Sequence, residues 1–211
     1  RFDERSAALF CFSREGQVRW VYRPTQAMSF GGSSEGVPER VNWVWLKPES
    51  SDRPSIWVES QHTSRYPAMV ERLNPDGTPT AGYWSNGLVL TARSGIVDGH
   101  EWLFLGGANN ELGGGFLAVI DPRALPASAP ASNVTYACDA CPAARPAHFF
   151  VFPSTKLCGI DGGMAAVSAV SVSQSGQVVV NVRHHAESLP GASAISSADS
   201  IYTLSHDFQL I

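Results

Sequence analysis

The side chains best suited to chemistry in this sequence are three closely spaced cysteines. Cys138 and Cys141 form a Cys-x-x-Cys pair, and Cys158 follows seventeen residues later. Such cysteines bind zinc, form disulfides or remain free thiols, and the spacing leaves all three alternatives open. Pro142 and Pro146 interrupt any strand near the pair, so we expect it on a loop. No cofactor is expected except zinc, for which Cys138, Cys141 and Cys158 are the candidate ligands.

A second group of polar side chains is marked by a repeat. Ile56–Val58, a polar loop, Met69–Leu73 and an Asn-Pro turn recur 46 to 47 residues later as Trp102–Phe104, a polar loop, Leu117–Ile120 and an Asp-Pro turn. A looser copy begins at Val178–Val180. If the copies are equivalent structural units, the loops inside them emerge at the same end of the domain.

We expect these loops to form a binding site, because rigid strands that present polar loops at one end commonly hold ligands. In the alternative, the asparagines and histidines only cap turns. The candidate ligand-binding residues are His62, Arg65, Asn109, Asn110, Glu111, His184, His185 and Glu187.

Two classes of function fit these loops. The first is a non-catalytic module that binds a small ligand or a protein partner, as a sensor or scaffold domain of a larger bacterial protein. The second is a glycosidase or lyase, for which Glu111 and Glu187 are the carboxylates expected on one face. Two carboxyls about 5 to 10 Å apart in a pocket would favour the enzyme. No Gly-x-Ser-x-Gly or His-Glu-x-x-His motif occurs, no catalytic residue is assigned, and the module is favoured.

Strands must position these residues, because no stretch of the sequence has the periodicity of an amphipathic helix. Short apolar and β-branched runs, separated by turn sequences, predict an antiparallel all-β fold with helix confined to isolated turns. The runs are Ala8–Phe12, Val18–Tyr22, Asn42–Leu46, Ile56–Glu59, Met69–Leu73, Leu88–Thr91, Trp102–Leu105, Phe116–Ile120, Phe149–Phe152, Val167–Val172, Val178–Val182 and Ile201–Leu204.

The repeat indicates which all-β architecture to expect. A unit of about 40 to 50 residues with four strands is typical of a propeller blade. We therefore predict a single β-propeller-like domain over residues 1–211, with about four blades. They comprise a half-blade at 7–24 and blades at about 42–85, 87–137 and 147–211. Either the C-terminal strand completes the half-blade and closes a ring, or upstream residues complete it and the chain is an open arc.

Two segments resemble known propeller families. Phe10–Trp20 resembles the sequence motif that repeats in the blades of quinoprotein-like propellers. It consists of an apolar strand, a Ser-Arg-Glu-Gly turn and a strand ending in Trp. Asp98–Gly107 is similar to the core of FG-GAP repeats, without the acidic spacing of a calcium loop. The chain thus resembles uncharacterised bacterial propeller domains that are joined to regulatory or signalling modules. The resemblance implies a propeller-like fold and supplies no ligand or catalytic residue.

Composition limits the partners. The 211 residues are 44% hydrophobic and 16% charged, which is enough apolar content for a substantial core. The formal charge of −4, with both signs mixed along the chain, argues against a nucleic-acid groove. No apolar run approaches the roughly 20 residues of a membrane-spanning helix. The expected partners are a small molecule or protein at the loops and the rest of a parent chain, and the compartment stays open.

Overall fold

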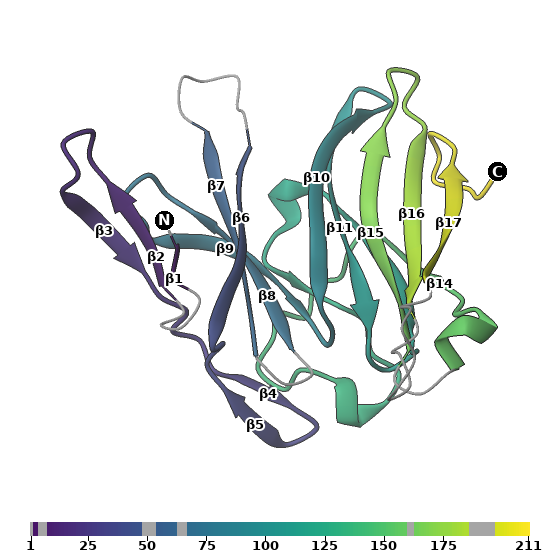
Figure 1. Cartoon of the computed structure of the whole chain (residues 1–211), viewed down its shortest axis with the longest axis horizontal. Coiled ribbons are helices and arrows are strands. Elements are labelled where there is room, and N and C mark those ends of the chain that lie inside the picture. Colours follow the sequence, from purple (N-terminus) through teal and green to yellow (C-terminus); the bar gives the residue numbers. More distant parts are fainter. Residues whose placement is uncertain (1, 4–7, 48–53, 63–66, 160–162, 186–196) are drawn as a thin grey trace. The chain divides into compact units, whose positions relative to one another are not determined.

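The structure, a computed structural model, describes residues 2–3, 8–47, 54–62, 67–159, 163–185 and 197–211 (Figure 1). In this part of the chain the regular elements are strands and three short 3-10 turns, without any α-helix. None of these helical turns is long and apolar enough to cross a lipid bilayer. The all-β class predicted from the sequence is confirmed. Each sheet is open, and β13 and β9 are the one parallel pair among the described strands.

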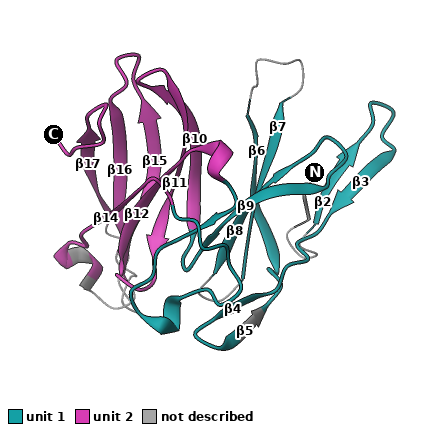
Figure 2. Ribbon diagram, turned by 180° about the vertical axis from the view of Figure 1, so that it is seen from behind, with its two compact units in different colours: residues 1–88, 125–145 teal, residues 89–124, 146–211 magenta. Residues whose placement is uncertain are grey.

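The chain divides into two compact units (Figure 2). Unit 1 comprises residues 1–88 and 125–145, and unit 2 comprises residues 89–124 and 146–211. Both units are therefore built from two separate stretches of the chain. The predicted blade at 87–137 crosses this division, because residues 125–145 belong to unit 1 and residues 89–124 belong to unit 2.

The main sheet of unit 1 has the strand order β13-β9-β8-β7-β6. Its strands are β6 (Arg40–Lys47), β7 (Ser55–Gln61), β8 (Ala68–Leu73), β9 (Pro79–Ser85) and β13 (Ala127–Ser128). Glu59 pairs with Val70, and Val58 pairs with Glu71. Because successive side chains of a strand point to opposite faces, Glu59 and Glu71 lie on opposite faces of this sheet.

Two smaller sheets complete unit 1. They are formed by β1 (Phe2–Asp3), β2 (Ala8–Phe12) and β3 (Val18–Tyr22), and by β4 (Met28–Phe30) and β5 (Ser33–Gly36). Leu9 and Tyr22 share a hydrophobic core with Val58 of the main sheet. The indole of Trp20 donates a 2.8 Å hydrogen bond to the carbonyl of Pro75. The β2–β3 hairpin is thereby fixed against the β8–β9 turn.

Unit 2 contains two sheets. One has the order β10-β11-β12-β14, and the other has the order β15-β16-β17. The strands are β10 (Val89–Val97), β11 (His100–Asn109), β12 (Gly114–Ile120), β14 (His148–Phe152), β15 (Met164–Val172), β16 (Val178–His185) and β17 (Ser197–Leu204). The sequence reading placed 147–152 in the last blade, whereas β14 pairs with β12 of the preceding sheet.

The two sheets of unit 2 enclose one hydrophobic core. Phe104 and Leu117 of the first sheet pack with Val167, Val180 and Val182 of the second. A Cβ at Gly106 would lie only 2.4 Å from a methyl of Val167. Glycine at position 106 thus lets the sheets approach closely.

One five-residue turn recurs along the chain. In this turn the backbone N–H of the first residue donates a hydrogen bond to the carbonyl of the fifth, and the N–O distance is 2.8 Å in all four copies. The copies are residues 13–17, 74–78, 173–177 and 205–209. The fourth residue has a positive φ, and it is Gly16, Gly77, Gly176 or Phe208. These turns include the Ser-Arg-Glu-Gly and Asn-Pro turns singled out above. The Asp-Pro turn instead forms the 3-10 turn η1 (Pro122–Ala124), so the structure matches the sequence repeat only in part.

Candidate functional site

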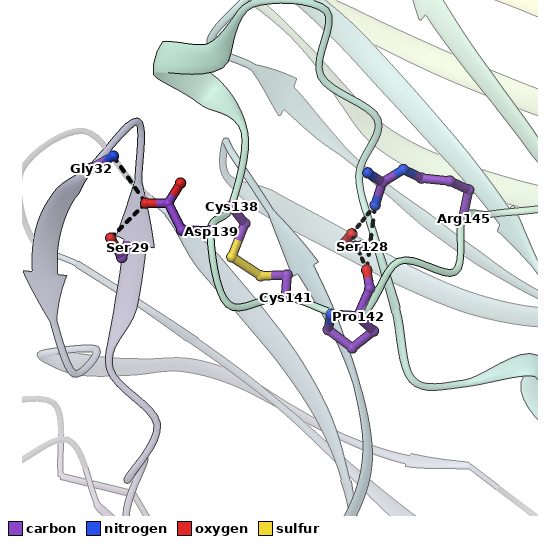
Figure 3. Close-up of a disulfide and its surroundings, with 8 residues drawn as sticks. All are labelled: Ser29, Gly32, Ser128, Cys138, Asp139, Cys141, Pro142 and Arg145. Carbon is purple, nitrogen blue, oxygen red and sulfur yellow. Dashed lines mark hydrogen bonds between the residues drawn. A yellow bond between two sulfur atoms is a disulfide. The ribbon is translucent and has the colours of Figure 1, made fainter.

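Cys138 and Cys141 form a disulfide on the loop that precedes β14 (Figure 3). Asp139, between them, faces the β4–β5 hairpin. Its Oδ2 accepts hydrogen bonds from the hydroxyl of Ser29 (2.7 Å) and the backbone N–H of Gly32 (2.9 Å). These bonds hold the pKa of Asp139 below its usual value. The disulfide loop therefore anchors the hairpin, and a structural role accounts for the Cys-x-x-Cys pair.

The disulfide leaves the zinc prediction without support. Zinc binds cysteine as a thiolate, and the sulfurs of Cys138 and Cys141 are bonded to each other. Cys158 is free, and it belongs to unit 2 rather than unit 1. No group of three or more His, Cys, Asp or Glu side chains suited to a metal occurs within the described residues. We therefore withdraw Cys138, Cys141 and Cys158 as a zinc site.

The first predicted loop of unit 2 is the turn from β11 to β12. Asn109 is buried, and its Oδ1 accepts a 2.9 Å hydrogen bond from the N–H of Leu112. Asn110 and Glu111 are half-buried. Asn109 thus stabilises the turn, which is the role expected if these asparagines and histidines cap turns rather than bind a ligand.

The second predicted loop lies partly in a strand, because β16 extends to His185. His184 is fully buried, with Nδ1 3.6 Å from Sγ of Cys158 and Nε2 3.0 Å from Oγ of Ser200. Cys158 lies in η3 (Lys156–Gly159), and Ser200 lies in β17. His185 projects to the other face of the sheet and is half-buried. The two adjacent imidazoles therefore diverge.

These two loops lie at the same end of unit 2. A Cβ at Gly115, beside the Asn109 turn, would lie 3.1 Å from Val182, close to His184. At the opposite end, a Cβ at Gly176 would lie 3.8 Å from Val97. Of the remaining candidates, His62 is buried directly after β7 in unit 1. Arg65 and Glu187 fall outside the described residues.

The acids with raised pKa do not form a catalytic pair. Burial raises the pKa of Glu59 well above its usual value, which Asn42 and Arg40 only partly offset. Burial also raises the pKa of Glu71, against a hydrogen bond from Tyr22. Because Glu59 and Glu71 lie on opposite faces of the main sheet, no substrate atom could contact both.

A polar hollow of about 280 Å³ opens at the other end of unit 2, where β10 meets β11 and β12 ends. Asp121 accepts hydrogen bonds from Nε (3.0 Å) and Nη2 (2.9 Å) of Arg123. Nε2 of His100 lies 3.4 Å from Oδ2 of Asp121. Hydrogen bonds from Arg123 lower the pKa of Asp121 to about 2. The residues lining this polar hollow are Gly99, His100, Glu101, Asp121, Pro122 and Arg123.

Aromatic side chains pack against His100, one of the residues that line the polar hollow. The ring of Trp102 lies 4.5 Å from that of His100 and 5.4 Å from that of Phe208, measured between centroids. The ring of His148 lies 4.6 Å from that of Phe208. Trp102 is thus occupied by packing contacts, as a tryptophan of a sheet core would be.

Sequence reasoning missed the polar hollow. It identified Asp121-Pro122 only as a turn, and Pro122 separates the carboxylate from its arginine partner. The β11–β12 register, in which Leu103 pairs with Ile120, brings the chain before Leu103 next to Asp121. The contact between His100 and Asp121 follows from that register, for which the local sequence carries no signal.

Comparison with protein-family models, with curated proteins and with solved structures finds no match to this chain. Its function is therefore argued from the geometry of its own residues.

Proposed function

We propose that the chain is a non-catalytic binding module of propeller-like blades that acts as a sensor or scaffold domain of a larger bacterial protein. The polar hollow is the observation that carries this proposal. Its volume, about 280 Å³, lies just below the range of about 300 to 1,000 Å³ that is usual for small-ligand sites. The repeated turn and the open sheets of three to five strands support the blade-like architecture.

The charges in the polar hollow indicate the ligand chemistry. The guanidinium of Arg123 makes two hydrogen bonds to the carboxylate of Asp121, so the two charges largely neutralise each other. A bare anion or cation would have to compete with this pair. A small polar ligand with both donors and acceptors, such as a polyol, a sugar or a zwitterion, would hydrogen-bond both partners without separating them.

The same pair argues against Asp121 as a general acid in the polar hollow. A general acid needs a carboxyl that is still protonated near neutral pH. Arg123 instead keeps the pKa of Asp121 at about 2, so this group is ionised. A glycosidase or lyase at the predicted loop end would require Glu187, which lies outside the described residues, and no specific observation favours that alternative.

Ligand-observed NMR with a panel of sugars, polyols and amino acids tests the proposal. A compound that binds the native chain should lose affinity at least tenfold in Arg123→Ala and Asp121→Asn, because each variant removes one half of the recognition pair. The bound compound should be recovered unchanged after long incubation. Conversion to product would favour the enzyme instead.

Arg183→Ala is the matched control. Arg183 and Asp199 form a similar exposed ion pair at 3.0 Å on β16 and β17, away from the polar hollow. Binding should survive this change. A triple variant, Asn110→Ala with Glu111→Ala and His185→Ala, tests the predicted loop end. Loss of binding in that variant alone would move the site to the loops.

A further inference from the structure

A thiol, an imidazole and a hydroxyl form a chain of contacts at the loop end of unit 2. Sγ of Cys158 lies 3.6 Å from Nδ1 of His184, and Nε2 of His184 lies 3.0 Å from Oγ of Ser200. The three side chains come from η3, β16 and β17. His184 is fully buried, whereas Cys158 and Ser200 retain exposed surface. Cys158, which also packs against the core of unit 2, is therefore partly in contact with solvent, whereas the imidazole is not.

The hydrogen bond to Ser200 determines what the imidazole offers the thiol. When Nε2 carries the proton and donates it to Ser200, Nδ1 is left with a lone pair directed at Cys158. In this tautomer His184 accepts the thiol proton. A cysteine paired with a histidine that a third group orients is the usual arrangement of an activated thiol.

Close backbone packing fixes the position of the cysteine. A Cβ at Gly163 would lie 2.9 Å from Cα of Cys158 and 2.7 Å from the carbonyl oxygen of His185. Only glycine at position 163 lets η3 approach the end of β16 this closely. The thiol therefore has a defined place beside the imidazole.

We propose that Cys158 is a nucleophilic thiol that exchanges with small-molecule disulfides, with His184 as its base and Ser200 as a positioning residue. The partner chemistry follows from Cys138–Cys141, because structural disulfides persist in oxidising surroundings. A free, activated thiol in such surroundings meets disulfides as its commonest electrophiles. The exposed cation of Lys156, on the same turn, suits an anionic disulfide.

The exchange balances without a further reagent. Nδ1 of His184 takes the thiol proton, and Sγ of Cys158 attacks one sulfur of the small disulfide. A new S–S bond forms to Cys158 as the old S–S bond breaks. The leaving thiolate takes up a proton from solvent, and the proton held by His184 is later lost to solvent, so that no net proton is consumed. The products are a mixed disulfide on Cys158 and one small thiol, and the reaction is independent of the proposed binding function.

Glutathione disulfide is the probe, and intact-protein mass measures the adduct. Cys11 is the internal control, because it is free and half-buried on β2, with no histidine bonded to it in the described part of the chain. In Cys11→Ser the remaining Cys158 should react about tenfold faster than Cys11 does in Cys158→Ser. Equal rates would overturn the proposal.

Variants of the other two groups separate activation from exposure. In His184→Gln the glutamine amide can still hydrogen-bond Ser200, but it cannot accept the proton of the thiol. The rate of exchange at Cys158 should therefore fall to that of Cys11. Ser200→Ala should slow the reaction several-fold, and Ser200→Thr should restore it. Gly163→Ala should slow it by displacing the thiol. If Cys158 keeps its rate in Ser200→Ala, the proposal fails; this comparison decides even if His184→Gln does not fold.

Discussion

The hydroxyl of Tyr22 donates a hydrogen bond to Oε2 of Glu71, and this bond joins β3 to the main sheet of unit 1. Both side chains are buried, with 3% and 8% of their surface exposed. Burial raises the pKa of both groups. The bond therefore stabilises a carboxylate that would otherwise be removed from water without a donor.

Replacing Tyr22 with Phe should lower the free energy of unfolding by about 1 to 3 kcal/mol, because the buried carboxyl of Glu71 loses its donor while the ring is kept. Urea denaturation followed by tryptophan fluorescence measures the loss. Tyr202→Phe is the control, since the ring of Tyr202 packs on Phe152 and its hydroxyl has no hydrogen bond to any described residue. Equal losses in the two variants would contradict the role of the bond.

Glu59 should make unit 1 less stable as pH rises. The side chain is fully buried, and interactions with Asn42 and Arg40 offset this burial only in part. Burial raises its folded-state pKa well above the ordinary 4.5. The folded state thus binds the proton more tightly than the unfolded state. The stabilisation is complete below about pH 4.5 and is lost as pH rises toward the folded-state pKa.

Glu59→Gln should therefore gain stability relative to the native chain between pH 4.5 and 8, because the amide has no proton to lose. Melting temperatures across this range, taken as the difference between the two proteins, isolate the effect from other acids. A difference that stays flat across this range would contradict the buried carboxyl.

Local sequence predicted the strands well because apolar runs and turn residues determine them over short distances. Val18–Tyr22 and Ala8–Phe12 were expected as strands and have those same bounds. A turn was also expected between the runs Val167–Val172 and Val178–Val182, and Gly176 between them has the positive φ that the turn requires. Three of the strands that were not expected are β4, β13 and β9. β4 and β13 hold only three and two residues, and β9 begins with Pro-Thr-Ala-Gly, which is not a strand-forming sequence.

Contacts between distant strands could not be predicted in the same way. β14 pairs with β12, although the segment between them includes residues 125–145, which belong to unit 1. Cys158 and His184 were singled out separately, as a metal ligand and a loop residue, and their contact spans 26 positions. Such contacts depend on strand register and sheet packing, which are set by the whole core rather than by neighbouring residues.

Gly106 and Val167 should be energetically coupled. A Cβ at position 106 would lie 2.4 Å from Cγ1 of Val167, so Gly106→Ala should destabilise unit 2 by about 1 to 3 kcal/mol. Val167→Ala removes the colliding methyls, and the double variant should lose less stability than the sum of the single variants. Urea denaturation of all four proteins measures the coupling. Strict additivity would show that the two sheets do not approach closely here.

Phe208 occupies the turn position that holds glycine at 16, 77 and 176, and its φ is +59°. A non-glycine residue in this conformation costs about 1 to 2 kcal/mol, yet the buried ring packs against Trp102 and His148, and removing such a ring costs about 3 to 5 kcal/mol. Packing should therefore exceed strain, and Phe208→Gly should lower the free energy of unfolding by about 1 to 4 kcal/mol. Gly176→Ala measures the strain alone, because its Cβ would approach no atom closer than 3.8 Å. A Phe208→Gly variant more stable than the native chain would mean that the ring contributes less than the strain it imposes.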